Sequence, residues 1–161
     1  MKVEARVTRK TRDLVLDSAE ELLRREVPEV ARVRRAEVWS FDVEDAAAAA
    51  DVRRVLEETT LVVNPNVHRW TLDEGDERTE GARLTVRVTE RVDAKEAAVL
   101  RGMRRCGAQG VRRAQRTVVW SLDLADTAAG SASRIGEEVA AILGNRHSQE
   151  VETRVSEGGK R

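Results

Sequence analysis

Aromatic residues are scarce in this chain of 161 residues: they make up 2% of it, as three Trp, one Phe and no Tyr. A sheet that binds single-stranded RNA needs exposed aromatic side chains on its central strands, so this composition argues against that class of protein. The charges point the same way, because 29 Lys and Arg residues are balanced by 29 Asp and Glu residues. The chain lacks the basic excess that is typical of nucleic-acid-binding proteins.

Cysteine and histidine are almost absent. Cys106 is the single cysteine, which excludes an internal disulfide framework and a thiolate metal cluster. His68 and His147 are too few and too far apart in sequence to form a typical zinc site. No apolar run reaches the length of a membrane span, and the first residues alternate like a strand and not like a secretion signal. We therefore expect a cytoplasmic protein with no metal, no cofactor and no membrane contact.

Recognisable catalytic motifs are also missing from the sequence. It has no Gly-rich phosphate loop, no H-E-x-x-H and no nucleophile elbow. Cys106 follows two arginines, a setting found at nucleophilic cysteines, but the matching position of the first half of the chain is Arg25. A structural helix cysteine is the better interpretation, and we expect no catalytic residue.

One stretch of the sequence occurs twice, at residues 35–48 and at residues 116–129. Both copies contain Val-Trp-Ser-x-Asp-x-x-Asp-x-Ala-Ala, and Trp39 and Trp120 are 81 positions apart (120 − 39). A repeat at about half of the chain length indicates a tandem duplication. Other identities at this offset are Arg6/Arg87, Arg24/Arg105, Val30/Val111 and Asn64/Asn145.

Apolar residues alternate with polar ones in the expected strands and recur at helical spacing in the expected helices, in the same order in both halves. Each half is predicted to follow β-α-β-β-α-β, a split βαβ unit with a four-stranded antiparallel sheet and its helices on one face. The fold class is thus α+β, a tandem duplication that forms a pseudo-dimer. The predicted organisation is a first repeat at 1–74, a linker at 75–82, a second repeat at 83–157 and a flexible tail at 158–161. Helices are predicted at 13–27, about 46–61, 94–106 and 127–143, and separate strands at 30–33 and 38–43, and again from Val111 and at 118–124.

The aspartates of the repeated stretch fall where a strand ends and a helix begins. Paired carboxylates can carry out acid–base chemistry or bind a metal ion. At these places, however, Asp45 and Asp126 are expected to be helix N-caps, and Asp42 and Asp123 to lie on the polar face of a strand.

Trp39 and Phe41 lie on the apolar face of their predicted strand, and the second copy repeats this arrangement. We expect these side chains to cover the sheet face that joins the two halves, like a dimer interface with aromatic anchors. A basic strip runs through the same region, and arginines of this kind suit an acidic partner surface. The predicted interface residues are Trp39, Phe41, Trp120, Leu122, Arg32, Arg34, Arg35, Arg113 and Arg116.

Three short stretches resemble the PurS subunit of phosphoribosylformylglycinamidine (FGAM) synthase. Residues 92–99 (Val-Asp-Ala-Lys-Glu-Ala-Ala-Val) resemble the start of that family's first helix, and residues 107–111 (Gly-Ala-Gln-Gly-Val) its turn into the second strand. Residues 61–70 (Leu-Val-Val-Asn-Pro-Asn-Val-His-Arg-Trp) resemble the end of its second helix and the start of its last strand. The order and spacing of these stretches carry the resemblance over nearly the whole chain.

The resemblance implies a tandem PurS-like protein, a non-catalytic accessory subunit in purine biosynthesis. The family bridges the ATP-using synthetase (PurL-type) subunit and the glutaminase (PurQ-type) subunit, so that ammonia from glutamine reaches the ribonucleotide substrate. The chain would then belong to a carbon–nitrogen ligase complex without catalysing the reaction itself. Two alternatives stay open, a tandem ACT-like regulatory protein that binds a small molecule and a ferredoxin-like RNA-binding protein. Further homo-oligomerisation also stays open.

Overall fold

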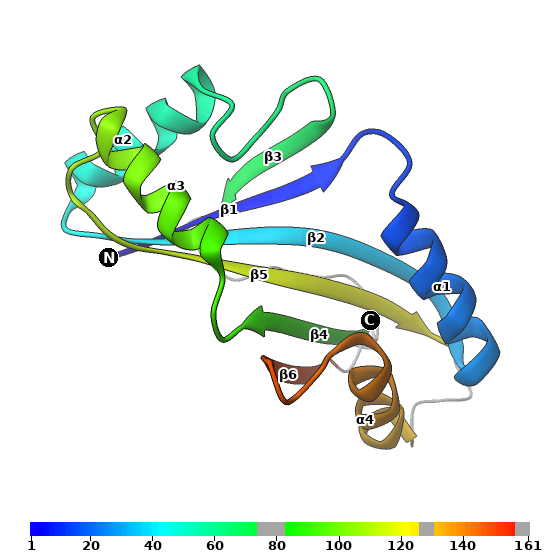
Figure 1. Ribbon diagram of the computed structural model, residues 1–161. Helices are drawn as coiled ribbons and strands as arrows, with labels where there is room; N and C mark the ends of the chain where they lie inside the picture. Colours follow the sequence, from blue (N-terminus) through cyan, green and yellow to red (C-terminus); the bar gives the residue numbers. More distant parts are fainter. Residues whose placement is uncertain (74–82, 126–130, 157–161) are drawn as a thin grey trace, which may run out of the picture. The chain divides into compact units, whose positions relative to one another are not determined.

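The computed structural model describes residues 1–73, 83–125 and 131–156 (Figure 1). It confirms a mixed α+β fold. The predicted linker and tail and the predicted N-cap Asp126 lie outside the described residues. The described elements are β1 (Lys2–Arg9), α1 (Leu14–Glu26), β2 (Val30–Val43), α2 (Ala46–Glu58), β3 (His68–Asp73), β4 (Arg83–Glu90), α3 (Ala94–Arg105), β5 (Val111–Leu124), α4 (Ala132–Leu143) and β6 (Gln149–Ser156).

The six described strands form one antiparallel sheet in the order β3-β1-β2-β5-β4-β6. β1 lies between β2 and β3, and Ala5 is opposite both Trp39 and Leu72. β4 pairs with β6 in the same way, with Val86 opposite Thr153. No helix in the described parts of the chain has the length and the apolar character that crossing a lipid bilayer requires.

The prediction of four strands in each half is wrong, because β2 and β5 each run without a break over 14 residues. The predicted break fell at residues 34–37 of the first half, which include Arg34, Arg35 and Glu37. This segment contains no Gly or Pro, so nothing in the backbone ends the strand. Its arginines are instead balanced by carboxylates and Glu37 lies near Arg116, as described below, so the strand continues.

The chain divides into two compact units that do not coincide with its two halves. Unit 1 contains β1, α2, β3 and α3, with residues 37–43 of β2 and 111–117 of β5. Unit 2 contains α1, β4, α4 and β6, with residues 30–36 of β2 and 118–124 of β5. The first helix of each half therefore packs in a different unit from the first strand of that half.

The core of unit 1 is formed by buried residues of its strands and by the apolar faces of α2 and α3. Five consecutive alanines at the start of α2 favour the helix, and Asp45 caps it by accepting a hydrogen bond from the Ala48 N–H at 2.8 Å, as predicted. The buried side chains include Val3, Ala5, Val7, Trp39, Phe41, Val43, Val52, Val55, Leu56, Val99, Met103, Val111 and Ala114.

The core of unit 2 is mainly aliphatic and lies between its strands and the faces of α1 and α4. Trp120 is the aromatic residue in this cluster. The buried side chains are Leu23, Val27, Val30, Val33, Leu84, Val86, Val88, Trp120, Leu122, Ile135, Val139 and Ala140.

The helices α1 and α3 correspond at an offset of 80, one less than the offset of 81 that aligns the strands. Each begins after an N-cap aspartate and buries the side chain ten positions later. The match of Arg24 with Arg105 at an offset of 81 is therefore not a structural equivalence. The corresponding pairs are Asp13/Asp93, Glu21/Arg101, Leu23/Met103, Arg24/Arg104 and Arg25/Arg105.

The two helices also end differently. Gly107, predicted near the end of α3, has a φ of 96°, a left-handed conformation that glycine adopts without strain. Its N–H donates to the Arg104 carbonyl and the Ala108 N–H donates to the Met103 carbonyl, which is a Schellman motif. α1 ends at Val27 with a φ of −132° and has no such turn.

Candidate functional site

The repeated Trp-Ser block is buried in two separate cores. In unit 1, Trp39 is 4% exposed and Phe41 is fully buried, and their rings stack with centroids 6.4 Å apart. In unit 2, Trp120 is 5% exposed and Leu122 is fully buried. The main role that this burial gives them is to fill the core of their own unit, and the predicted seam between the halves stays a prediction.

Arg35 of the predicted basic strip is held inside unit 2. Its Nη1 donates to Oδ2 of Asp13 at 3.0 Å, and only 13% of the Arg35 side chain and 10% of the Asp13 side chain are exposed. The other oxygen of Asp13 accepts from the backbone N–H groups of Val15 and Leu16, so one carboxylate both caps α1 and anchors β2. The guanidinium also lies over the Trp120 ring, 5.6 Å from its centroid, where a cation is attracted by the ring face.

Arg116 makes the corresponding contact in unit 1. Its Nε donates to Oδ2 of Asp93 at 2.8 Å, while Oδ1 of Asp93 accepts from the Lys95 N–H at 2.8 Å and caps α3. Glu37 lies 3.7 Å from Nη1 of Arg116, and Glu96 accepts from the backbone N–H of Arg116 at 2.7 Å. The same pair, a helix N-cap aspartate and an arginine in the long strand, thus occurs once in each unit.

Opposing effects set the ionisation of the pair in unit 1. Burial alone would raise the pKa of Asp93, but hydrogen bonds from Arg116 and from the Lys95 N–H, with the charges of both residues, outweigh burial and lower the pKa below its ordinary value of 3.8. Burial likewise opposes the charge of Arg116, and its contacts with Asp93 and Glu37 outweigh that effect and raise its pKa. The pair is therefore fully ionised at neutral pH.

The other arginines of the predicted strip are more exposed. Arg34 donates to Asp123 at 2.8 Å, and these two side chains are 37% and 31% exposed. This contact places Asp123 on the polar face of its strand, as predicted. Arg32 and Arg113 are exposed. The arginines of the predicted strip thus differ in role. Arg35 and Arg116 bind carboxylates inside their units, whereas Arg32 and Arg113 face solvent.

Histidine and cysteine hold structural positions in the described residues. His68 starts β3, and its Nδ1 accepts from the Asn64 N–H at 3.2 Å. Gln149 makes the matching contact with Asn145 in the second half, so an amide can replace the imidazole there. Cys106 is the C-cap of α3 and is partly buried. Throughout the ranges that the structure describes, no group of three or more His, Cys, Asp or Glu side chains could hold a metal ion.

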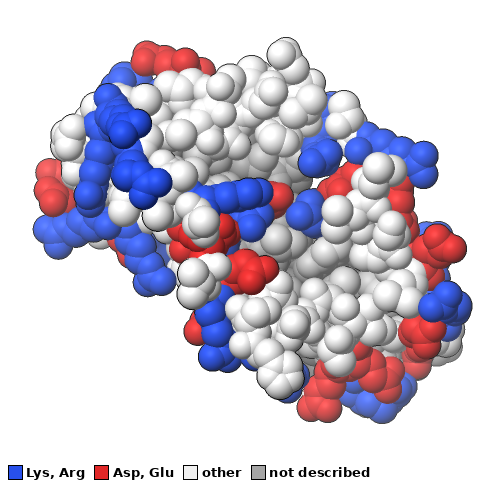
Figure 2. Space-filling view, in the orientation of Figure 1, with Lys and Arg blue, Asp and Glu red and all other residues white. Residues whose placement is uncertain are grey.

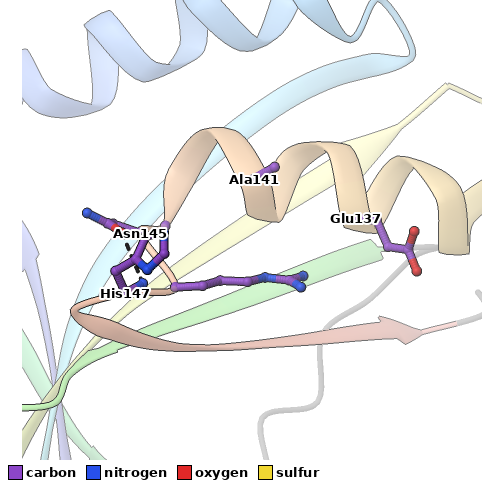
Figure 3. A pocket seen from close by; sticks show the side chains of 6 residues that line it. Glu137, Ala141, Asn145 and His147 are labelled. Atoms are coloured by element: carbon purple, nitrogen blue, oxygen red, sulfur yellow. Dashed lines mark hydrogen bonds between the residues drawn. The ribbon is translucent and has the colours of Figure 1, made fainter.

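An open hollow of about 710 Å³ lies beside the end of α4 in unit 2 (Figure 3). Oδ1 of Asn145 accepts from the His147 N–H at 3.0 Å, which shapes the turn after the helix. Figure 3 shows Glu137 earlier on α4 and away from the two turn residues. The polar groups that line the hollow can contact a small polar ligand. The lining residues are Glu137, Ala141, Gly144, Asn145, Arg146 and His147.

Two features of the molecule could have been predicted from the sequence but were not. Asp13 and Asp93 were not recognised as partners of the strand arginines, although an aspartate directly before a helical pattern is an N-cap signal. The exposed arginines of α3 were not singled out either. Their spacing at Arg101, Arg104 and Arg105 places them on one side of a helix and could have identified them.

Neither the protein-family models nor the curated proteins contain a match to this chain.

Proposed function

We propose that this protein is a non-catalytic accessory subunit of FGAM synthase, in which two PurS-like repeats form a pseudo-dimer. The observation that carries the proposal is the equivalence of β2 and β5: the first twelve positions of these strands have the same sequence of buried, partly buried and exposed side chains. The strand order supports it. From either edge of the sheet inward, the order is the last strand, the first strand and the long strand of one half. The function in this proposal comes from the resemblance of three stretches of the sequence to PurS.

In this proposal the subunit acts through its surfaces and works in the cytoplasm. It would bridge the PurL-type synthetase and the PurQ-type glutaminase, so that ammonia passes between their sites. The N-cap aspartates and strand arginines would hold the fold rigid, since each arginine is fixed by a carboxylate from a distant part of the chain. The proposed seam between the repeats involves Trp39, Phe41, Trp120 and Leu122.

The test is reconstitution with purified synthetase and glutaminase subunits. We expect glutamine-dependent formation of FGAM to require this protein, because glutamine nitrogen must cross between two subunits. Formation from ammonium chloride should proceed without it, and this reaction controls for the activity of the synthetase. Failure to co-elute with either subunit, with no effect on the glutamine-dependent rate, would contradict the proposal.

One observation favours an alternative, a tandem ACT-like protein that binds a small molecule. The hollow beside α4 presents Arg146 and His147, and both side chains are exposed. Calorimetry against the amino acids separates the two functions. Saturable heats with an amino acid, lost in R146A, would favour the regulatory protein over the accessory subunit.

A further inference from the structure

The corresponding helices α1 and α3 differ sharply in charge. α1 contains four acidic and two basic residues, whereas α3 contains one acidic and four basic residues. Where α1 has Glu20, Glu21 and Glu26, α3 has no acid: the corresponding residues are a leucine, Arg101 and a cysteine. The last-turn arginines are kept in both helices, where they interact favourably with the helix dipole.

The arginines of α1 are neutralised by neighbours on the same helix. Arg24 contacts Glu20 at 2.8 Å, and Arg25 contacts Glu26 at 2.8 Å. The arginines of α3 have no carboxylate within 4.0 Å in the described ranges 1–73, 83–125 and 131–156. Arg104 donates to the Val111 carbonyl at 3.0 and 3.2 Å, which orders its side chain but leaves its charge unbalanced.

The positive charge continues from α3 into the start of β5, still within unit 1. Arg112 and Arg113 follow the turn after α3 and are exposed. Arg112 contacts Glu44 at 3.3 Å, and both of these side chains are largely exposed. Figure 2 shows Lys and Arg side chains gathered over the region where α2 and α3 lie in Figure 1. We define the α3 basic surface as Arg101, Arg104, Arg105, Arg112 and Arg113.

The chemistry of this surface selects among anionic partners. A surface that binds single-stranded RNA combines arginines with exposed aromatic rings, yet Trp39 and Phe41, the aromatic residues of β2, are buried. Guanidinium groups make bidentate hydrogen bonds with carboxylates, and several of them on one helix side suit a surface that carries several Asp or Glu residues. Each arginine here is solvated, so such a contact would depend on salt.

We propose that the α3 basic surface docks an acidic surface of a partner protein. The inference rests on the proposed function, which makes that partner the synthetase or the glutaminase subunit. It assigns the contact to α3 and the start of β5 in unit 1, since the corresponding helix α1 carries the opposite charge. The basic strip predicted from the repeated strands therefore contributes Arg113 but not Arg35 or Arg116, which are held in the interior.

The test is a charge reversal that spares the internal contacts. R101E/R105E/R113E changes three exposed side chains and keeps Arg104, which binds the Val111 carbonyl, and Arg112, which contacts Glu44. R9E/R69E/R154E is the matched control, because it makes the same change of charge at three exposed arginines on β1, β3 and β6. Circular dichroism and thermal unfolding establish that both variants fold.

Binding to the synthetase and to the glutaminase is measured separately by calorimetry at low and high salt. We expect R101E/R105E/R113E to weaken the affinity for one subunit by about tenfold or more, and the control to change it by less than about threefold. Wild-type affinity for that subunit should fall as salt rises.

Three results would overturn the inference. Equal binding by wild type and R101E/R105E/R113E would refute the docking surface and leave the proposed function intact. Binding of neither subunit by the wild type would refute the proposed function, and the inference with it. Binding of labelled single-stranded oligouridylate by wild type, lost in R101E/R105E/R113E but not in the control, would assign the surface to nucleic acid instead.

Discussion

Unit 1 packs its core around two stacked rings, Trp39 and Phe41, whereas unit 2 places Trp120 beside Leu122 and covers the indole with the Arg35 guanidinium. The long strands nevertheless bury the same positions in both units. The comparison teaches that alternation along a strand determines which positions are buried, while the side chains at those positions can change if the neighbouring helix fits them.

The surfaces differ more than the cores. α1 and α3 share an N-cap aspartate, a buried residue ten positions later and two last-turn arginines. Their solvent-facing charges have opposite signs, because exposed positions have little influence on packing. The two helices thus share the residues that hold each unit together and differ at exposed positions.

The largest expected effect comes from truncating one buried side chain in each core, at corresponding positions. Phe41→Ala should lower the free energy of unfolding by about 3–5 kcal/mol and Leu122→Ala by about 2–5 kcal/mol, because both side chains are fully buried. Urea titration measures the loss. Hydrogen exchange should rise in α2 and α3 for Phe41→Ala and in α1 and α4 for Leu122→Ala. A uniform rise in both variants would show that the units do not respond separately.

A smaller loss is expected from the N-cap aspartates that bind strand arginines. Asp13→Ala and Asp93→Ala should each cost about 2–3 kcal/mol, since each removes a helix cap and the carboxylate that balances a mostly buried guanidinium. Asn keeps the cap, so Asp13→Asn and Asp93→Asn isolate the ion pair and should cost less. Unfolding in urea at pH 7 measures all four variants. Equal losses for Ala and Asn would mean that the cap contributes little and the ion pair nearly everything.

A pH dependence should separate the ion pair of unit 1 from its cap. The pKa of Asp93 is lowered in the folded protein, so its stabilisation is complete above the ordinary value of 3.8 and is lost as the pH falls below it. The difference in stability between wild type and Asp93→Asn should therefore be largest near neutral pH and shrink in acid. Urea titrations between pH 7 and pH 3 measure this difference. A difference that does not vary with pH would show that the charge of Asp93 contributes nothing.

The smallest effect tests the opposite charges of α1 and α3. Arg101→Glu places a carboxylate one turn before Arg104 and Arg105 and should stabilise the protein by about 0.3–0.5 kcal/mol, whereas Glu21→Arg removes such a carboxylate from α1 and should destabilise it by a similar amount. Thermal unfolding at low salt gives the sign of each change. If both variants lost stability, the charge of α3 would have a structural role.

Much of the fold could be predicted because its signals are local. The helices and strands follow from apolar periodicity, and the cap of α2 follows from Asp45 in front of a run of alanines. The continuity of β2 could not be predicted in this way. A charged side chain on the core side of a strand looks like a break unless its partner is known, and the partner of Arg35 is 22 positions earlier in the chain.

The residues of the candidate site show the same contrast between local signals and long-range contacts. The predicted interface residues include four apolar side chains that fill the cores and two arginines that bind internal carboxylates. Their residue types and spacing were sufficient to single them out, but the same pattern fits a partner surface and an interior pair equally well. The choice between the two depends on whether another segment of the chain reaches them.

The amino-acid sequence was thus sufficient to detect the repeated stretch, which is a direct comparison of residues. It was also sufficient for the apolar periodicity and the starts of α1, α2 and α3, because each of these depends on neighbours within a few residues. Tertiary structure decided which helix joins which unit, that two strands run unbroken, and which arginines face solvent. Those outcomes depend on burial, since a guanidinium is stable inside the protein only where a carboxylate from a distant segment balances it.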